Sequence, residues 1–325
     1  MTEPRRVLIT GAYGLVGSAL ARACLDRGDS VTVLRRREQP LSALVLEKTE
    51  ARCAVAEGDL LADGLLTRVI GERDIDTVFH LAAESIVGAA QHDPVSAFEV
   101  NVRGTWLLLD ACATHGVRRV VVASTSQGQD EPRSSETPLV LRQPYALTKA
   151  CADLVARSWW HAHGLPVATA RCSNVYGGGD RNGSRLVPAA VAAALRGEDP
   201  IIDSDGSPRR DFCFVEDAAA AYLAIASALD DPDAGARGTA FNVGSGAAHT
   251  VLEVVELVCA TADTGVQPTL RGDAGGVDQT AVDVGELGAA TGWTPAVGIE
   301  DGIARTVDWY RRYPQALEPL IAASR

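Results

Sequence analysis

Short apolar runs rich in β-branched residues alternate with longer amphipathic stretches through the first half of the chain. The runs have the length of buried strands, and the stretches have the period of helices that cover a sheet. The predicted strands are residues 6–10, 30–34, 77–82, 119–124 and 166–171, and the predicted helices are residues 16–27, 94–115 and 145–163. This order predicts an α/β fold with a Rossmann-like, doubly wound parallel sheet.

The pattern changes after about residue 175. Loops rich in Gly, Asp, Asn and Pro, at 177–183 and 203–208, separate shorter helical segments. We therefore predict a sheet domain at 1–175 with a return segment near 211–245. Residues 176–210 and 246–325 are then expected to form a smaller lobe.

Composition narrows the possible functions. The 325 residues carry a net charge of −12, which opposes binding to nucleic acid or to an anionic membrane surface. No apolar run approaches the roughly 20 residues of a membrane span, and no secretory apolar segment precedes the first predicted strand. The seven cysteines are scattered without a Cys-x-x-Cys pair, so no disulfide framework and no metal site are predicted. We expect a cytoplasmic protein.

Three glycines connect the first predicted strand to the first predicted helix. Gly11, Gly14 and Gly17 are spaced Gly-x-x-Gly-x-x-Gly. Glycine lets the backbone turn tightly and approach a pyrophosphate, while the amides of the helix N-terminus attract the anion. The turn therefore predicts a dinucleotide-binding site.

The residues after the second predicted strand bear on which dinucleotide binds. An acidic residue at this place accepts a hydrogen bond from the free ribose 2′-hydroxyl of NAD. Here the strand continues into Arg35, Arg36 and Arg37. Because arginine pairs well with a 2′-phosphate, this run favours NADP over NAD.

A tyrosine and a lysine stand four residues apart at the start of a predicted helix. Tyr145 and Lys149 therefore share one helical face, where an ammonium group can stabilise the phenolate for general-base catalysis. Only two of the 30 basic residues are lysines, so retention of Lys149 indicates a role that arginine does not fill. The strand at 119–124 ends beside Thr125, whose hydroxyl can bind the same substrate oxygen.

Together with other motifs, these features resemble the nucleotide-sugar epimerases and dehydratases among the extended short-chain dehydrogenase/reductases. The matching segments, in family order, are residues 11–17, 58–60, 80–85, 101–105, 145–149, 171–177, 210–217 and 242–244. The resemblance covers nearly the whole chain. It implies an NAD(P)-dependent enzyme that oxidises a sugar hydroxyl, usually at C4, and often returns the hydride.

The resemblance also implies site residues. Those expected at the cofactor are Gly11, Tyr13, Gly14, Leu15, Val16, Gly17, Arg35, Arg36, Asp59, Leu60, Leu81, Ala82, Ala83, Asn101, Tyr145 and Lys149. Those expected at a nucleotide-diphosphate sugar are Ser85, Ser126, Gln127, Asn174, Arg185, Leu186, Val187, Arg210 and Arg271. Thr125, Tyr145 and Lys149 are the predicted catalytic residues. The helices at 94–115 and 145–163 are expected to pair in a homodimer.

One departure separates the possible reactions. In the 4,6-dehydratases the active threonine is followed by Asp and Glu, whereas here Ser126 and Gln127 follow, and neither can act as a carboxylate acid or base. We therefore predict a 4-epimerase. A 4,6-dehydratase or a C5-acting relative that uses another carboxylate, such as Glu84, is the alternative. A dinucleotide-sensing protein without catalysis is the alternative outside the enzymes.

Overall fold

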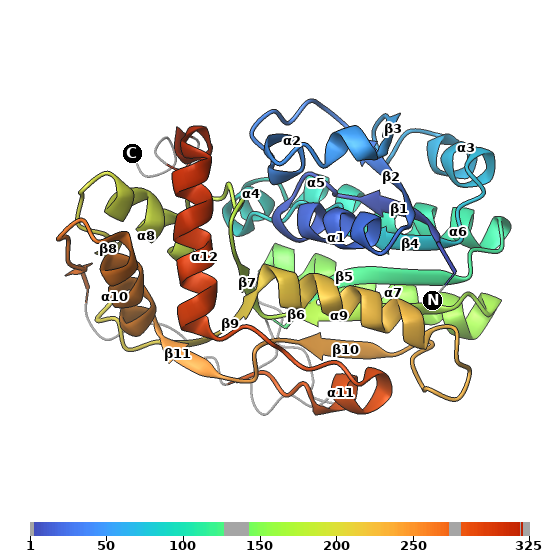
Figure 1. The fold of residues 1–325 in the computed structure, drawn as a ribbon. Coiled ribbons are helices and arrows are strands. Elements are labelled where there is room, and N and C mark those ends of the chain that lie inside the picture. The colour runs from blue at the N-terminus through green and yellow to red at the C-terminus, as the bar shows by residue number, and fades with distance from the viewer. Residues whose placement is uncertain (1–2, 127–142, 273–280, 319, 321–325) are drawn as a thin grey trace.

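A parallel sheet forms the centre of the computed structural model, which describes residues 3–126, 143–272, 281–318 and 320. Within these residues the sheet has seven strands in the order β10-β6-β5-β4-β1-β2-β3 (Figure 1). The strands are β1 (Arg6–Thr10), β2 (Ser30–Arg35), β3 (Ala54–Glu57), β4 (Thr77–His80), β5 (Arg119–Thr125), β6 (Val167–Cys172) and β10 (Ala240–Val243). All neighbouring pairs are parallel, which confirms the predicted Rossmann-like fold.

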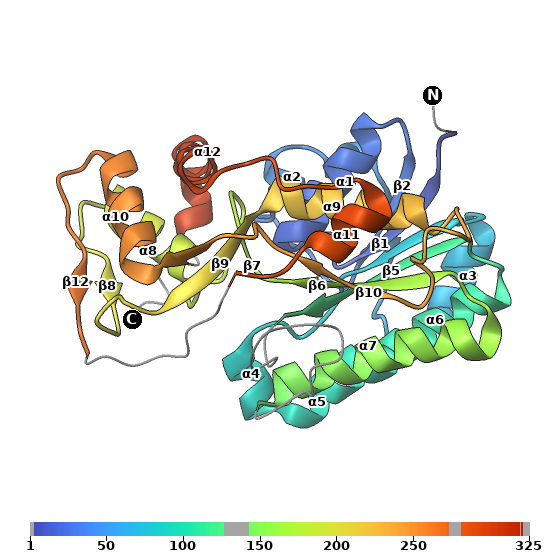
Figure 2. The same cartoon turned by 90° about the horizontal axis from the view of Figure 1, so that it is seen from below.

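Helices cover both faces of this sheet (Figure 2). The helices that connect its strands are α1 (Leu15–Asp26), α2 (Ala43–Leu46), α3 (Leu65–Glu72), α4 (Val87–His92), α5 (Pro94–Phe98), α6 (Gly104–Thr114), α7 (Pro144–His163) and α9 (Val215–Ala228). Side chains alternate along β1, so that Val7 and Ile9 enter the core beneath α1 and α9 while Leu8 enters the core beneath α3 and α6. No helix of the described residues has the length and apolar character needed to cross a membrane.

The predicted helix at 94–115 contains one irregular turn. A π-helical turn at Glu99–Arg103 separates α5 from α6. Gly104 follows this turn at a close contact, since a Cβ there would lie 2.5 Å from Cδ2 of Leu60. Residues 94–114 are helical throughout, so the predicted helix is confirmed, with the π-helical turn inside it. Sequence periodicity alone does not register a local packing constraint of this kind.

The second half of the chain adds two smaller sheets. A three-stranded sheet has the order β11-β9-β7, and β12 pairs with β8. The elements are β7 (Asn174–Tyr176), α8 (Leu186–Leu195), β8 (Ile201–Ile202), β9 (Arg209–Phe214), β11 (Ala248–Thr250), α10 (Val251–Ala262), β12 (Thr269–Leu270), α11 (Gly285–Thr291) and α12 (Ile299–Arg312).

One buried carboxylate joins these segments to each other. Asp211 on β9 accepts hydrogen bonds from the Ser173 hydroxyl at 2.9 Å and from the backbone amides of Ser245, Gly246 and Val282 at 2.8, 3.1 and 3.0 Å. Because an isolated buried carboxylate is costly, these donors stabilise the charge, and the bonds hold three chain segments against β9.

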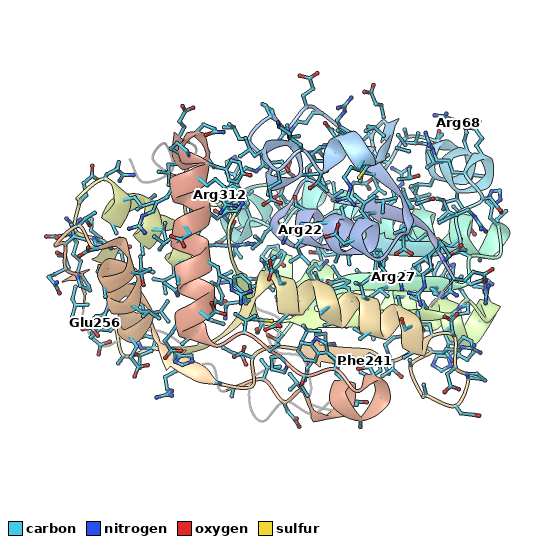
Figure 3. The ribbon with its side chains drawn as sticks, viewed as in Figure 1. Arg22, Arg27, Arg68, Phe241, Glu256 and Arg312 are labelled. Atoms are coloured by element: carbon cyan, nitrogen blue, oxygen red, sulfur yellow. The ribbon has the colours of Figure 1, made fainter. Side chains whose placement is uncertain are left out.

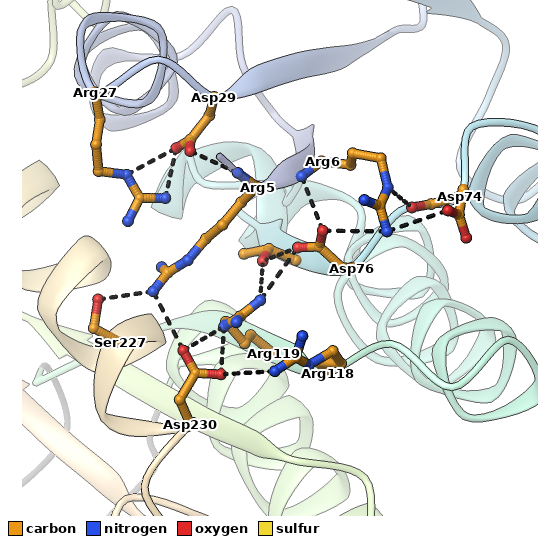
Figure 4. Close-up of polar contacts among 11 residues, drawn as sticks. Arg5, Arg6, Arg27, Asp29, Asp74, Asp76, Arg118, Arg119, Ser227 and Asp230 are labelled. Carbon is orange, nitrogen blue, oxygen red and sulfur yellow. Dashed lines mark hydrogen bonds and ion pairs between the residues drawn. The ribbon is translucent and has the colours of Figure 1, made fainter. Parts of the chain in front are cut away.

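The amino ends of the central strands carry a network of ion pairs (Figure 4). Asp230 lies 2.7 Å from Nε of Arg119 and 3.5 Å from Nη2 of Arg5. Arg119 also lies 3.2 Å from Asp76. Here buried guanidinium groups have carboxylate partners within the protein.

Candidate active site

A cavity of about 970 Å³ lies at the carboxyl ends of the central strands. Gly11 follows β1, Thr125 ends β5 and Cys172 ends β6, and all three line it. The opposite wall consists of the loop before α8, the first turn of α8 and Arg210 on β9. Parallel α/β sheets bind their ligands at this edge.

The glycine turn fits a pyrophosphate. Gly11 has φ +73°, and a Cβ on it would lie 2.6 Å from the backbone nitrogen of Ala82, so only glycine fits. Gly14 caps α1 without a side-chain hydrogen bond, and the first turn of α1 contains no acidic residue. Because Gly14, Leu15, Val16 and Gly17 line the cavity, the amino end of α1 faces it with amides available to an anion.

The predicted catalytic residues meet in this cavity. Pro144 begins α7, and Tyr145 and Lys149 line the cavity one helical turn apart, facing Thr125 at the end of β5. Burial raises the pKa of Tyr145, whereas the positive charge of Arg185 and a hydrogen bond with Thr125 lower that pKa. The positive charge of Arg185, from the opposite wall of the cavity, therefore offsets part of the effect of burial, and the pKa of Tyr145 stays above its ordinary value.

Lys149 is buried behind the tyrosine. Burial lowers the pKa of Lys149 to about 8, while the negative forms of Cys172 and Asp153 act in the opposite direction. The lysine therefore changes charge close to neutral pH, unlike a lysine in water.

A layer of hydrogen bonds supports the wall beneath these residues. His80 hydrogen-bonds Thr10 at 2.7 Å through Nδ1 and Thr105 at 3.1 Å through Nε2. Burial and the charge of Lys149 lower the pKa of His80 to about 3, so the ring is neutral. Asn101 donates to the Glu84 carbonyl at 3.1 Å and to the Thr148 hydroxyl at 2.9 Å, which ties the 81–86 segment to α7.

The wall formed by the second half of the chain is cationic. Arg185 and Arg210 line the cavity beside Asn174, whose side-chain amide donates to the Asp211 carbonyl at 3.1 Å. Asp180 is the only carboxylate that lines the cavity within the described parts of the chain, and it is buried and lies 3.1 Å from Nη1 of Arg185.

The structure brings most of the predicted site residues together. The predicted residues that line the cavity are Gly11, Gly14, Leu15, Val16, Gly17, Leu81, Ala83, Ser85, Thr125, Tyr145, Lys149, Asn174, Arg185, Leu186, Val187 and Arg210.

Other predicted residues do not line the cavity. These are Tyr13, Arg35, Arg36, Asp59, Leu60, Ala82, Asn101, Ser126 and Arg271, while Gln127 lies outside the described residues. Arg35 forms ion pairs with Glu50, at 3.1 Å, and with Glu57. Ser126 is buried, and its amide donates to the Cys172 carbonyl at 3.0 Å.

Sequence reasoning missed several residues of the cavity. Gln39, Asp180, Arg181 and Tyr222 line it but were not predicted, whereas Arg37 belongs to the arginine run that predicted NADP. The signal for Asp180 and Arg181 was the glycine-rich loop that precedes them. For Tyr222, which lies in the middle of α9, the sequence offers no signal.

Comparisons with known proteins agree with this geometry. The sequence model of the NAD dependent epimerase/dehydratase family matches residues 7–244. The chain is 32% identical to a dTDP-glucose 4,6-dehydratase of Streptomyces griseus over 98% of this chain and 97% of that protein.

Two solved structures are also similar. One is the dTDP-glucose 4,6-dehydratase DesIV from Streptomyces venezuelae with NAD and TYD bound, with 30% identity, TM-score 0.83 and coverage of 97% of this chain and 99% of that one. The other is the UDP-glucose 4-epimerase of Thermus thermophilus in complex with NAD, with 30% identity, TM-score 0.80 and coverage of 94% and 99%.

Proposed function

Because the chain belongs to the NAD-dependent epimerase/dehydratase family, we propose that it is a nucleotide-sugar 4-epimerase. The observation that supports this activity is the composition of the cavity. Tyr145, Lys149 and Thr125 lie beside a glycine turn that fits a dinucleotide, and the facing wall presents Arg185 and Arg210 to a nucleotide diphosphate. An epimerase and a dehydratase of this family would both need these groups.

The acidic groups distinguish the two reactions. Elimination of water from a hexose needs an acid and a base in addition to the tyrosine. Among the described lining residues the only carboxylate is Asp180, which is paired with Arg185. The Glu84 carboxylate does not line the cavity and accepts from the Ile86 amide at 3.3 Å. Ser126 and Gln127 stand where the dehydratases carry their Asp-Glu pair, and this departure favours epimerisation, which needs no such pair.

A dehydratase is the second candidate. The curated relative from Streptomyces griseus and the DesIV structure are both dTDP-glucose 4,6-dehydratases. A dehydratase built on this chain would need carboxylates other than the Asp-Glu pair that Ser126 and Gln127 replace.

The chain's own residues account for the proton transfers. Tyr145 takes the proton of the C4 hydroxyl, with Thr125 bound to the same oxygen, and returns it after the ring has turned over. Arg185 lowers the pKa of Tyr145 against the larger effect of burial, and protonated Lys149, one helical turn away, would stabilise negative charge on the tyrosine during the transfer. A bound nicotinamide dinucleotide supplies a hydride acceptor and donor. Leu81 and Ala83 line its side of the cavity, and the amino end of α1 would hold its pyrophosphate.

Mass spectrometry distinguishes the candidates. The purified protein is incubated in deuterated water with UDP-, CDP-, GDP- and dTDP-hexoses, and isomers are resolved by chromatography. We expect an isomer of unchanged mass without deuterium, since the hydride that leaves C4 also returns to C4. Loss of one water with deuterium incorporated would establish a dehydratase. An isomer that carries deuterium would indicate exchange at C5, and no product despite dinucleotide binding would indicate a sensor.

We further propose NADP as the preferred dinucleotide. Arg36 and Arg37 follow β2 and form no ion pair within the described residues, and Arg37 lines the cavity. A 2′-phosphate would supply an anion for them. Titration of the apo protein with NADPH and NADH tests the preference, and tighter binding of NADH would contradict it.

We also propose a homodimer through the helices below the sheet in Figure 2. Large apolar side chains on these helices are exposed: Val95 on α5 by 72%, Leu154 on α7 by 57% and Trp106 on α6 by 41%. Helices α5, α6 and α7 pack together, and exposed large apolar side chains on neighbouring helices are typical of an interface. Leu154→Glu should convert a dimer to a monomer in sedimentation analysis. Leu270→Glu, at an exposed leucine on β12, is the matched control. A monomeric wild type would contradict the proposal.

A further inference from the structure

Arg181 connects the two walls of the cavity. It lies in the loop between β7 and α8, yet Nη1 donates to Oε1 of Gln39 at 2.7 Å and Nη2 donates to the carbonyl of Tyr13 at 3.2 Å. Tyr13 belongs to the glycine turn and Gln39 follows β2. The guanidinium therefore reaches from the second half of the chain to the end of the cavity where the dinucleotide is proposed to bind.

Close packing holds the loop that carries Arg181. Gly179 has φ +91°, and a Cβ there would lie 2.6 Å from Cβ of Ala43 on α2. On the other side, a Cβ on Gly178 would lie 2.2 Å from the Trp309 ring on α12. Glycines let the loop pass between these two helices, so the position of Arg181 is built into the fold.

The charge of Arg181 has no close carboxylate partner of its own among the described residues. Both hydrogen-bond acceptors are neutral, and the neighbouring Asp180 carboxylate is bound to Arg185 at 3.1 Å and to the Asn182 amide at 3.1 Å. Burial and the positive charge of Arg37 lower the pKa of Arg181, while Asp180 acts weakly in the other direction. Arg37 and Arg181 both line the cavity and each carries a positive charge there, so an anion bound between them would offset their repulsion.

We propose that Arg37 and Arg181 together bind a phosphate of the adenosine half of the dinucleotide, so that the substrate-side loop holds the cofactor in place. This inference rests on the proposed function of the cavity and adds a contact that the motif residues do not include. The phosphate is the adenosine 2′-phosphate or the pyrophosphate. Gln39 and Arg37 follow β2, where the ribose is recognised, and Tyr13 lies in the turn that fits the pyrophosphate.

Direct binding tests the inference without catalysis. The full chain is stripped of dinucleotide, and Arg181→Gln and Arg37→Gln are each titrated with NADPH and NADH by nicotinamide fluorescence. Both variants should weaken binding by about tenfold or more, the effect of one lost charged hydrogen bond. Arg68→Gln, on α3 at the far end of the molecule in Figure 3, is the control and should bind as the wild type does.

The two dinucleotides identify the phosphate. A loss confined to NADPH assigns the pair to the 2′-phosphate, and an equal loss for both assigns it to the pyrophosphate. Unchanged affinity of either variant for both dinucleotides would overturn the inference. Because Arg37 is exposed, Arg37→Gln gives this answer even where Arg181→Gln does not fold. A wild type that binds neither dinucleotide would instead overturn the proposed function and the inference with it.

Discussion

Arginines gather at both ends of the central sheet, but their partners differ. At the amino end, Arg5 and Arg119 share the carboxylate of Asp230, and Arg119 also reaches Asp76 (Figure 4). At the carboxyl end, Arg181 bonds an amide oxygen and a backbone carbonyl, and Arg37 brings a second positive charge towards it.

This difference in partners distinguishes arginines that stabilise the fold from arginines that can bind an anionic ligand. A guanidinium that is paired within the protein stabilises the fold and offers little to a solute, because its donors are already used. A guanidinium whose acceptors are neutral and whose neighbour is also positive destabilises the folded protein unless an anion binds to it. The two ends of one sheet should therefore respond differently to substitution, one in stability and the other in binding and turnover.

The largest expected effect is at the carboxyl end. Tyr145→Phe removes the hydroxyl that takes the substrate proton, so turnover should fall by roughly 10²–10⁴-fold, the usual contribution of a general acid-base group. Product formation is measured with the best nucleotide sugar of the panel.

Two controls accompany this variant. Tyr313→Phe, at a tyrosine outside the cavity, should leave turnover unchanged. NADPH titration of Tyr145→Phe should still show binding, because the glycine turn is intact. Full turnover in Tyr145→Phe would show that another group carries the proton.

At the amino end, the change should appear in stability. Asp230→Asn leaves Arg5 and Arg119 without their shared charge. Breaking a fully buried pair costs roughly 3–5 kcal/mol, and since the Asp230 side chain is 37% exposed we expect a smaller loss of about 2 kcal/mol in the free energy of unfolding. Urea unfolding measures it. Dinucleotide affinity should not change, and a weakened affinity would show that the two ends are coupled.

The pH dependence should be confined to the carboxyl end. The pKa of Lys149 is about 8, below the ordinary value of 10.5, so the amine loses its proton as pH rises through 8. If the ammonium form is needed, kcat/KM falls tenfold per pH unit above about 8, equivalent to about 1.4 kcal/mol per unit.

Stability should respond to the same group with the opposite sign. A lysine whose pKa is lowered on folding destabilises the folded state while it is protonated. Between pH 8 and 10.5 the neutral folded form relieves this cost, so the wild type should gain stability relative to Lys149→Met across that interval. Urea unfolding of both proteins at several pH values tests this, and a constant difference would contradict the lowered pKa.

The elements with a clear local pattern of apolar and polar residues were predicted correctly. The glycine turn, α7 and the β-branched strands β1, β2, β5 and β6 lie within one or two residues of their predicted bounds. The short β3 and α3 were not predicted, since neither carries a long periodic run. The π-helical turn before Gly104 was not predicted either, and Gly104 packs close to Leu60, a residue far away in the sequence.

The site shows the same division between local and distant information. Residues in motifs, such as Tyr145, Lys149 and Asn174, reach the cavity as predicted from their spacing and resemblance. Arg185 was predicted from the resemblance, whereas Arg181, in the same loop, was not. The effect of the Arg185 charge on the pKa of Tyr145 depends on the tertiary arrangement and has no sequence signature.

Arg35 gives the sharpest test of the comparison, with the smallest expected effect. It ends β2 at the dinucleotide end of the sheet, but its partners are carboxylates, Glu50 and Glu57, as at the amino end. If partners decide the role of an arginine, Arg35→Gln should change the affinity for NADPH and NADH by less than about threefold, within the range of surface ion pairs. Arg36→Gln, at the neighbour without an ion pair in the described chain, is measured alongside. A tenfold loss of affinity for NADPH in Arg35→Gln alone would mean that Arg35 leaves its carboxylates to bind the 2′-phosphate. The position of an arginine along the strand, and not its partners in the protein, would then decide its role.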